Sequence, residues 1–524
     1  MGAAVHSTQD KTLRRVALQA ISDTAFFPPA GQNRLRGMIE AKPDWVLSRQ
    51  RAWGVPISVF FNKETQEVIP NAKWKHSDEL IARITDSFKK DGADAWYKPG
   101  AAHGYLKGLV DNPDDWQKVD DILDVWFESG CTHAFVLEQR PDLKWPADLY
   151  LEGSDQHRGW FHSSLLESCG TRGRAPYDQV LTHGFVMAED GRKMSKSLNN
   201  TVTPQDVIKT SGADILRLWV MSSDYSDDLR IGPEILKANV ESYRKLRNTW
   251  RWLLGSLTHF DAKKAVDHKH LPELERLMLH TLAELDITVR EGYAAYDFKR
   301  VFQALSNFCI VDLSAFYFDI RKDTLYCEPE DSAKRLAALT VVDRIFNCLT
   351  IWLSPMVPFT AEESWLIRHP SETGSVHLQT IPVIPRGWTD NKLAEKWDGV
   401  RTIRKAVTGA LELERAGKRI GSSLEAAPIV YIDDPEIAAY LKGIDLAELC
   451  ITSGATLVQG PIPEGAFRHD DVRHVGVVFA CAEGKKCERS WRITQDVGSD
   501  KDYPTLSARD AAAVRAWDAR QIAQ

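Results

Sequence analysis

The side chains best suited to chemistry stand in one short cationic stretch, residues 191–200 (GRKMSKSLNN). Lys193 and Lys196 are three residues apart, with Ser195 between them. An ammonium group binds phosphate oxygens as a point charge, so two lysines in one loop could hold a phosphate chain. The same residue types also occur in ordinary solvated turns, and two lysines alone do not separate these interpretations.

The elements that must position this loop are a strand before it and a helix after it. Residues 180–187 begin with apolar and β-branched side chains, which predict a strand. Thr203 and Pro204 precede a helical pattern, and both are typical of helix starts. An open α/β sheet binds its ligands outside the carboxyl ends of its strands, so this order puts the lysines on the ligand side.

A second group of polar side chains follows another predicted strand, residues 148–153. Glu152 stands near the carboxyl end of this strand, where its carboxylate could bind an ammonium group. Residues 154–161 (SDQHRGWF) then open a helix whose free N–H groups suit an anion or a ribose, with Ser154 or Asp155 as its cap. The alternative is that this helix start carries an ordinary set of capping and ion-pairing side chains: Asp155, His157 and Arg158.

The composition describes a globular protein of a reducing compartment. The 524 residues predict two to four domains, and an apolar share of 43% suffices for a buried core. The eight cysteines are scattered singly, which indicates reduced thiols and a cytoplasmic protein. Residues 1–11 show no secretory signal, and no run approaches the ~18 apolar residues of a membrane span, so no membrane partner is expected. A net charge of −7 means that any RNA site must be a local basic patch.

The chain divides into three predicted parts. Residues 1–230 form an α/β domain that carries both candidate sites and an insertion at about 58–145. Residues 231–395 show four helical patterns with apolar side chains three and four apart, which predict a helical bundle. Residues 396–524 combine a helix with two short strands in a small α+β module. The first bundle helix has a basic face, which is either a solvated surface or an RNA-binding one: Arg244, Arg247 and Arg251.

Several strings resemble the class I aminoacyl-tRNA synthetases. The KMSKS of the lysine loop is similar to the signature loop of that class, and LEGSDQHRGWF at 151–161 is similar to its isoleucyl branch. WVLSRQRAWGVP at 45–56 resembles the same branch, although its chemistry also allows a plain Arg–Trp packing cluster. FYFDIRKD at 316–323 is similar to a motif of the anticodon-binding bundle. The resemblance runs from about residue 11 to the C-terminus and matches the C-terminal half or so of the family's length.

The resemblance implies an α/β fold, the second half of a class I Rossmann-type nucleotide fold, followed by an all-α anticodon-binding bundle and a small α+β module. It implies an isoleucine–tRNA ligase that uses ATP with Mg²⁺ to make isoleucyl-adenylate and then acylates tRNA-Ile. Isoleucine and tRNA-Ile are the expected partners, with the three arginines and the C-terminal module contacting the tRNA. The intact enzyme would be a monomer.

The same resemblance implies roles for individual residues. Lys196, and secondarily Lys193, would bind the triphosphate in the transition state, with Ser195 beside them. Glu152 would bind the amino group of the adenylate. Three residues would face adenine with their backbone: Gly184, Phe185 and Val186. The remaining residues would line the amino acid or ribose, or wall the side-chain pocket: Gly153, Asp155, Gln156, Trp126 and Trp160.

Two features of the family have no counterpart in the sequence. Class I enzymes carry a second signature, His-Ile-Gly-His or a close variant, and we find nothing like it. The editing domain is also absent, and the one methylene between isoleucine and valine is worth only about 1–3 kcal/mol, a general value for which this same family is the standard example. We therefore expect a fragment, or one half of a split enzyme that works with a separate N-terminal half. The alternative is a non-catalytic tRNA-binding protein; an unrelated nucleotidyl transferase would not explain the helical bundle.

A structural zinc is not expected. Many members of the isoleucyl branch end in two Cys-x-x-Cys pairs that bind zinc, and the corresponding pairs here run from Cys487 to Ser490 and from Ser507 to Asp510. Structural zinc needs four nitrogen or sulfur ligands, so the one remaining cysteine does not make a site. We predict that hydrogen bonds and packing around Trp491 replace the ion.

Overall fold

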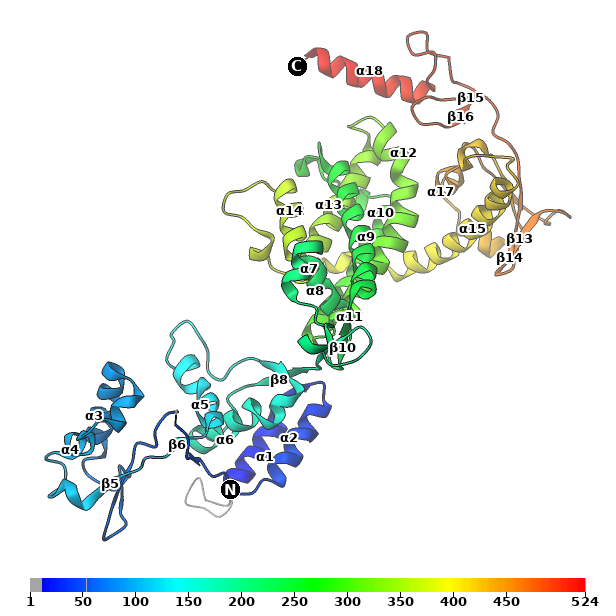
Figure 1. The fold of residues 1–524 in the computed structure, drawn as a ribbon. Helices are drawn as coiled ribbons and strands as arrows, with labels where there is room; N and C mark the ends of the chain where they lie inside the picture. The colour runs from blue at the N-terminus through cyan, green and yellow to red at the C-terminus, as the bar shows by residue number, and fades with distance from the viewer. Residues whose placement is uncertain (1–11, 53, 524) are drawn as a thin grey trace. The chain divides into compact units, whose positions relative to one another are not determined.

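The computed structural model describes residues 12–52 and 54–523, which form two compact units (Figure 1). Each unit is made of two stretches of chain that are separate in the sequence. The first unit comprises Met1–Phe185 and Tyr225–Leu229, and the second comprises Val186–Asp224 and Arg230–Gln524.

The first unit is built on a parallel sheet of three strands in the order β1–β8–β7. Parallel strands need long crossover connections, and three helices supply apolar side chains that pack with the strands in one core. Glu152 lies level with Thr182 and Gly153 with His183, so β7 and β8 end at the same edge of the sheet. The elements are α1 (Leu13–Asp23), β1 (Ala25–Phe27), α2 (Ala30–Glu40), β7 (Tyr150–Gly153), α6 (Trp160–Arg172) and β8 (Gln179–His183).

The expected insertion has a small core of its own. A three-stranded antiparallel sheet in the order β4–β3–β5 packs its apolar side chains with the following helices, around Phe60 and the fully buried Trp96. The chain enters through β2 and returns through β6, which pair antiparallel. Its elements are β2 (Ser48–Arg49), β3 (Phe60–Asn62), β4 (Val68–Ile69), α3 (Ser77–Asp91), η1 (Ala93–Tyr97), α4 (Ala101–Leu106), η2 (Pro113–Asp115), β5 (Trp116–Lys118), β6 (Ile122–Leu123), α5 (Val125–Gly130) and η3 (His133–Leu137).

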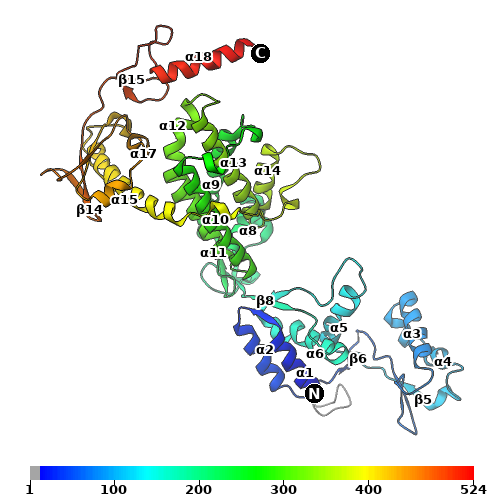
Figure 2. The same ribbon diagram turned by 180° about the vertical axis from the view of Figure 1, so that it is seen from behind.

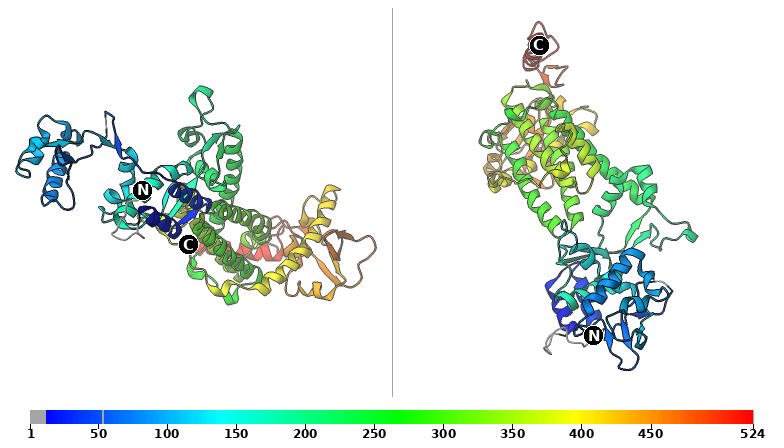
Figure 3. Two further views of the ribbon diagram at one scale, coloured as in Figure 1. Left: turned by 90° about the horizontal axis from the view of Figure 1, so that it is seen from below. Right: turned by 90° about the vertical axis from the view of Figure 1, so that its left-hand side faces the viewer.

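The second unit contains the predicted helical bundle. All four predicted amphipathic patterns form helices, and their apolar faces meet in one core whose members include the fully buried Leu253, Val342 and Phe346. The bundle helices lie side by side in both views of Figure 3. The helices are α7 (Pro204–Ser211), α8 (Ala213–Ser222), α9 (Pro233–Leu257), α10 (Glu273–Ala294), α11 (Phe298–Asn307), η8 (Phe308–Phe318), α12 (Asp319–Cys327), α13 (Ala333–Leu353) and α14 (Pro358–Arg368).

The C-terminal module continues the same core. Helix α15 packs against β13 and β14 of a four-stranded sheet in the order β12–β11–β14–β13 (Figure 2). The predicted strands at 428–432 and 472–479 are β11 and β14, while β12 and β13 were not predicted. The elements are α15 (Asn391–Ala416), β11 (Ile429–Ile432), α16 (Pro435–Ala439), α17 (Leu446–Cys450), β12 (Thr456–Gln459), β13 (Phe467–His469), β14 (Val472–Val478), β15 (Lys485–Lys486), β16 (Ile493–Thr494) and α18 (Ala508–Ala523).

The observed units differ from the predicted parts, because the lysine loop and the two helices after it fold with the bundle. The buried carboxylate of Asp214, at the start of α8, accepts the N–H groups of Phe359 (3.3 Å) and Thr360 (2.8 Å). These amides belong to the first turn of α14, whose free N–H groups need acceptors. Residues 186–224 therefore belong to the second compact unit.

Two bundle segments are long and apolar enough to cross a membrane by length and composition alone. They are Phe298–Cys327 and Ala333–Leu353, whose most apolar windows have mean hydropathies of 1.4 and 1.5. Those windows are 50% and 78% buried inside the protein. Their hydropathy therefore reflects their packing in the bundle core.

A buried ion-pair cluster joins the bundle to the C-terminal module. The guanidinium of Arg321 donates to both carboxylate oxygens of Glu275 (2.6 and 2.7 Å), and its third nitrogen donates to Glu448 of α17 (2.9 Å). Arg321 is 4% exposed and Glu275 is fully buried. Removing one partner of such a pair leaves an uncompensated charge in a low-dielectric interior.

Arg321→Met should therefore destabilise the second unit by about 3–5 kcal/mol. The exposed pair Arg300–Glu291 (2.9 Å) is a matched control, and Arg300→Met should cost less than about 1 kcal/mol. Urea unfolding of both variants, followed by tryptophan fluorescence, measures the difference. Equal losses in the two variants would contradict this account of the cluster.

Candidate active site

The carboxyl edge of the sheet presents Glu152 and Gly153. They end β7, and the turn η4 (Ser154–Arg158) leads from them into α6. The Glu152 side chain is exposed and has no hydrogen-bond or ion-pair partner among the described residues. Its carboxylate can therefore accept an ammonium group without first breaking an internal contact.

Gln156, rather than Ser154 or Asp155, satisfies the start of α6. Its Oε1 accepts the N–H of Trp160 (3.0 Å), and its Nε2 donates to Oδ2 of Asp155 (3.0 Å). The prediction that Ser154 or Asp155 caps this helix is wrong, because the 3-10 turn inserted before α6 brings residue 156 to the first helical amide. The polar groups of Asp155 and Gln156 are thus fixed close to the end of β7.

Trp126 and Trp160, far apart in the chain, come together through reciprocal contacts. The ring of Trp126 packs on Gly159, where a Cβ would lie 2.8 Å from the ring. The indole N–H of Trp160 donates to the carbonyl of Ser129 on α5 (3.1 Å), and its ring stacks on Tyr150 with centroids 4.1 Å apart. Each tryptophan is therefore held by the segment that carries the other, and Trp126 remains 42% exposed.

A cavity of about 190 Å³ opens beside Trp126 and Gly159. Its wall includes Lys42 and His162, which the sequence did not single out. Burial, reinforced by the charges of Lys42 and Arg158, lowers the pKa of His162 to about 4, so this imidazole is neutral at pH 7. Burial also lowers the pKa of Lys42. The one sequence signal for Lys42 was its place just before the string at 45–56.

Asp124 joins two segments beside this cavity, residues 45–49 and the start of α5. Its buried carboxylate accepts the indole N–H of Trp45 (3.0 Å) and the backbone N–H of Trp126 (3.0 Å), and it pairs with Arg49. Burial alone would raise the pKa of Asp124, but these hydrogen bonds and the charge of Arg49 keep the pKa below its ordinary value. Arg49 and Trp45 thus form a packing cluster that supports Trp126, while Trp53 lies outside the described residues.

Gly184 and Phe185 follow β8 at the same edge of the sheet, and their amides are already bonded. The Gly184 N–H donates to a carbonyl of the segment 225–229 (2.9 Å), and the Phe185 N–H donates to Oδ1 of Asp228 (2.8 Å). A Cβ on Gly184 would overlap the backbone of that segment, so only glycine permits the crossing. Val186 opens β9 (Val186–Ala188) in the second unit.

The lysine loop is shaped by its own polar side chains. Asn200 accepts the N–H of Ser195 (2.9 Å) through Oδ1 and donates to the carbonyl of Lys193 (3.3 Å) through Nδ2. The Oγ of Ser195 accepts the N–H of Leu198 (3.3 Å) at the end of the turn η5 (Lys196–Leu198). Both lysine side chains are exposed, and within 12–52 and 54–523 neither has a carboxylate partner. Two ammonium groups are therefore available to one anionic ligand.

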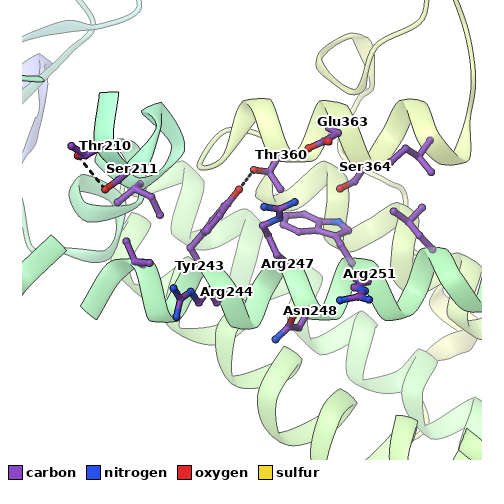
Figure 4. Close-up of a pocket in the computed structure, with 15 residues that line it drawn as sticks. Thr210, Ser211, Tyr243, Arg244, Arg247, Asn248, Arg251, Thr360, Glu363 and Ser364 are labelled. Carbon is purple, nitrogen blue, oxygen red and sulfur yellow. Dashed lines mark hydrogen bonds between the residues drawn. The ribbon is translucent and has the colours of Figure 1, made fainter. Parts of the chain in front are cut away.

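The three arginines of α9 line a cavity of about 720 Å³, whose other walls come from α7, α8 and α14 (Figure 4). Arg244 pairs with Glu241 (2.8 Å), while the guanidinium of Arg247 lies 5.9 Å from the ring centroid of Tyr243. Neither Arg247 nor Arg251 has a carboxylate partner in the part of the chain that the structure describes. The cavity suits an anionic group.

A buried carboxyl lies behind the first-unit site. Glu167 of α6 is 9% exposed, and neither of its oxygens reaches a hydrogen-bond donor in good geometry among the described residues. It packs so closely on Gly130 that a Cβ there would overlap the carboxyl group. Burial raises the pKa of Glu167 to about 7, against a smaller opposing effect of the Cys131 thiol. The carboxyl is therefore partly protonated at neutral pH.

Two families match the chain. The family "tRNA synthetases class I (I, L, M and V)" matches residues 6–232, and "Anticodon-binding domain of tRNA ligase" matches residues 275–430. Isoleucine–tRNA ligases of Brucella abortus (strain 2308) and Mesorhizobium japonicum are each 60% identical to the chain, over 504 and 505 residues. The alignments cover 96% of this chain and 51% and 50% of those proteins. The chain thus spans about half the length of the curated relatives it matches.

Two solved structures are similar at much lower identity. The LeuRS–tRNA–LeuAMS ternary complex of Agrobacterium radiobacter K84 has a TM-score of 0.49 and 18% identity, covering 66% of this chain and 43% of that one. Mycobacterium tuberculosis methionyl-tRNA synthetase in complex with methionyl-adenylate has a TM-score of 0.47 and 16% identity, covering 67% of this chain and 59% of that one.

The raised pKa of Glu167 predicts a stability that falls with rising pH. The folded state keeps this proton between about pH 4.5 and 7 while the unfolded state has lost it, so the free energy of unfolding decreases over that window. Glu167→Gln removes the effect and should be more stable than the unaltered protein by on the order of 1–3 kcal/mol at pH 8, with little difference at pH 4.

Urea unfolding at both pH values measures this difference. Glu138→Gln is the matched control, because the guanidinium of Arg172 (2.7 Å) lowers the pKa of Glu138 and its loss should cost stability at pH 8. An unchanged pH dependence in Glu167→Gln would contradict the assignment.

Proposed function

Because the chain belongs to the class I tRNA synthetases and is 60% identical over 96% of its length to isoleucine–tRNA ligases, we propose that it supplies one part of such a ligase. The ligase activates isoleucine with ATP and transfers it to tRNA-Ile. The observation that carries the proposal is the Glu152 carboxylate, which is exposed and has no partner among the described residues. It stands on the segment that contacts α5 through Gly159 and Trp160. A protein that only binds RNA has no need of this arrangement.

In this proposal the first unit holds the amino acid. The carboxylate of Glu152 binds the ammonium group of isoleucine and of its adenylate. Trp126 supplies an exposed ring to the side chain, and the hydrogen bond from Trp160 to Ser129 holds the helix α5 that carries this ring. Gly153, Asp155 and Gln156 offer polar groups to the ribose or the amino acid, because the bonds between Asp155 and Gln156 hold both side chains in place.

The lysine loop of the second unit serves the phosphates. A carboxylate oxygen of isoleucine attacks the α-phosphorus of ATP, the bond to the bridging oxygen breaks, and pyrophosphate leaves with the electron pair. Lys196, with Lys193, neutralises the charge that develops on the leaving group, and Ser195 keeps the loop in shape. ATP enters as its Mg²⁺ complex, in which the ion neutralises part of the phosphate charge. The backbone at Gly184, Phe185 and Val186 faces adenine, which requires segment 225–229 to release the two amides it now engages.

The bundle and the C-terminal module bind tRNA-Ile in this proposal. Arg247 and Arg251 have no carboxylate partner in the described ranges and face a cavity wide enough for a backbone phosphate, with Glu363 as one carboxylate in its wall. Arg244 joins them when it releases Glu241. Phosphate contacts of this kind position an RNA without reading its sequence.

We propose that the ligase is cytoplasmic, monomeric when complete, free of zinc, and dependent on a separate N-terminal half or on a longer chain. The second candidate function is non-catalytic tRNA binding. The arginine-lined cavity alone would support it, since that cavity belongs to the bundle. The two candidates differ in whether the first unit binds an adenylate.

The proposed role of Glu152 predicts the affinity for a non-hydrolysable isoleucyl-adenylate analogue. Glu152→Gln removes a hydrogen bond between charged groups worth about 1.5–3 kcal/mol, so the Kd should rise about tenfold to more than a hundredfold. Isothermal titration calorimetry measures the Kd for the chain and the variant. Glu64→Gln, an exposed carboxylate in the insertion, is the control and should leave the Kd unchanged. No binding by the unaltered chain, or equal Kd values for Glu152→Gln and the chain, would contradict the proposal.

A further inference from the structure

Three side chains near the C-terminus converge on one carboxylate oxygen. The Oδ2 of Asp510 lies 3.0 Å from the Sγ of Cys487, 2.6 Å from the Oγ of Ser490 and 2.9 Å from the Oγ of Ser507. Cys487 and Asp510 are fully buried, and Ser507 is 6% exposed. An ionised carboxylate only accepts hydrogen bonds, so the thiol and both hydroxyls donate to this one oxygen.

The four residues stand at the positions of a zinc knuckle, but their donor set does not fit zinc. Cys487 and Ser490 form one pair with two residues between them, and Ser507 and Asp510 form the other. A closed structural zinc site takes four nitrogen or sulfur ligands at about 2.0–2.3 Å, whereas this set offers one thiol, two hydroxyls and a carboxylate. The three contacts to Oδ2 have the lengths of hydrogen bonds. The Oδ2 atom itself lies at the centre of the cluster, and the side chains of the other three residues point at it.

Backbone hydrogen bonds complete the knuckle around this centre. The N–H of Ser507 points at the Sγ of Cys487 (3.4 Å), which joins the two pairs, and the N–H of Trp491 donates to the carbonyl of Cys487 (2.9 Å). The ring of Trp491 is 62% exposed. Hydrogen bonds were predicted here together with packing around Trp491, and only the packing part is wrong. The Trp491 side chain faces solvent, while the carboxylate of Asp510 takes the interior position.

The cluster also fixes the module on the bundle. The other carboxylate oxygen of Asp510, Oδ1, accepts a hydrogen bond from Arg509 (3.1 Å). The same guanidinium pairs with Asp323 of α12 through two contacts (2.5 and 3.0 Å). Arg489, inside the first pair, donates to the carbonyl of Tyr326 (3.0 Å). One buried carboxylate thus organises both pairs and orients the arginine that reaches the bundle.

We propose that the Asp510 carboxylate replaces a zinc ion, and that the four positions it joins are a latent tetrathiolate metal site. The C-terminal knuckle folds around hydrogen bonds alone, and its position on α12 does not depend on metal. Restoring cysteine at the three substituted positions should then create a metal site without other changes, because the backbone already brings all four residues to one centre.

The test is the triple variant Ser490→Cys, Ser507→Cys, Asp510→Cys, refolded or expressed with Zn²⁺ and then dialysed. We expect one zinc per chain by atomic absorption, and a tetrahedral thiolate spectrum when Co²⁺ is used instead. The unaltered chain should hold none under the same conditions. Adding Cys481→Ser to the triple variant is the control, since this exposed thiol lies outside the cluster and its loss should not change the stoichiometry.

Hydrogen exchange provides a second readout that does not need the triple variant to fold. Asp510→Leu should speed exchange at residues 485–495 and 505–515 at least tenfold, whereas Asp500→Asn, which removes an exposed pair with Arg515, should not affect residues 485–495. Stoichiometric zinc in the unaltered chain, a folded triple variant that binds none, or unchanged exchange in Asp510→Leu would each overturn the proposal. None of these readouts depends on ligase activity.

Discussion

The first unit depends on the buried carboxylate of Asp124. It satisfies the indole of Trp45, the guanidinium of Arg49 and the backbone N–H of Trp126, so two segments meet at one charge. A charge so far from solvent is tolerated only when it is fully paired, which ties the segments to a single arrangement. Because the backbone N–H of Trp126 is one of these partners, the carboxylate also fixes the backbone that carries the exposed Trp126 ring. The proposed binding surface around Trp126 is thus supported by an ion pair whose carboxylate is buried and whose arginine side chain is 37% exposed.

Side chains that support and side chains that bind are separated throughout the molecule. Asn200, Gln156 and Arg321 are engaged in internal hydrogen bonds, whereas Glu152 and Lys196 have no such partners among the described residues. The internal hydrogen bonds fix the backbone around these residues. The charges of Glu152 and Lys196 have no internal partner among the described residues, so they are available to a ligand.

Local patterns predicted the bundle helices and α15 but not α16, α17 or α18, and tertiary contacts decided much of the rest. The apolar spacing at 236–257 predicted α9, because one face of that helix supplies the core. The strand β12 was missed because it is a short edge strand with mostly exposed side chains. The capping role of Gln156 depends on the 3-10 turn before α6, which the sequence did not predict. The central role of Asp510 depends on a contact with Cys487, 23 residues away. Residue type alone favoured Ser154 or Asp155 as the helix cap and Trp491 as the centre of the packing that replaces the ion.

The central claim is that this chain contributes a competent part of a ligase active site. Isoleucine-dependent ATP–pyrophosphate exchange tests it most directly, measured for the chain alone and after mixing with a separately expressed N-terminal half from a relative. The account predicts exchange on mixing that falls about tenfold to more than a hundredfold in Lys196→Ala. No exchange on mixing, with tRNA still bound, would contradict the account and favour a tRNA-binding protein.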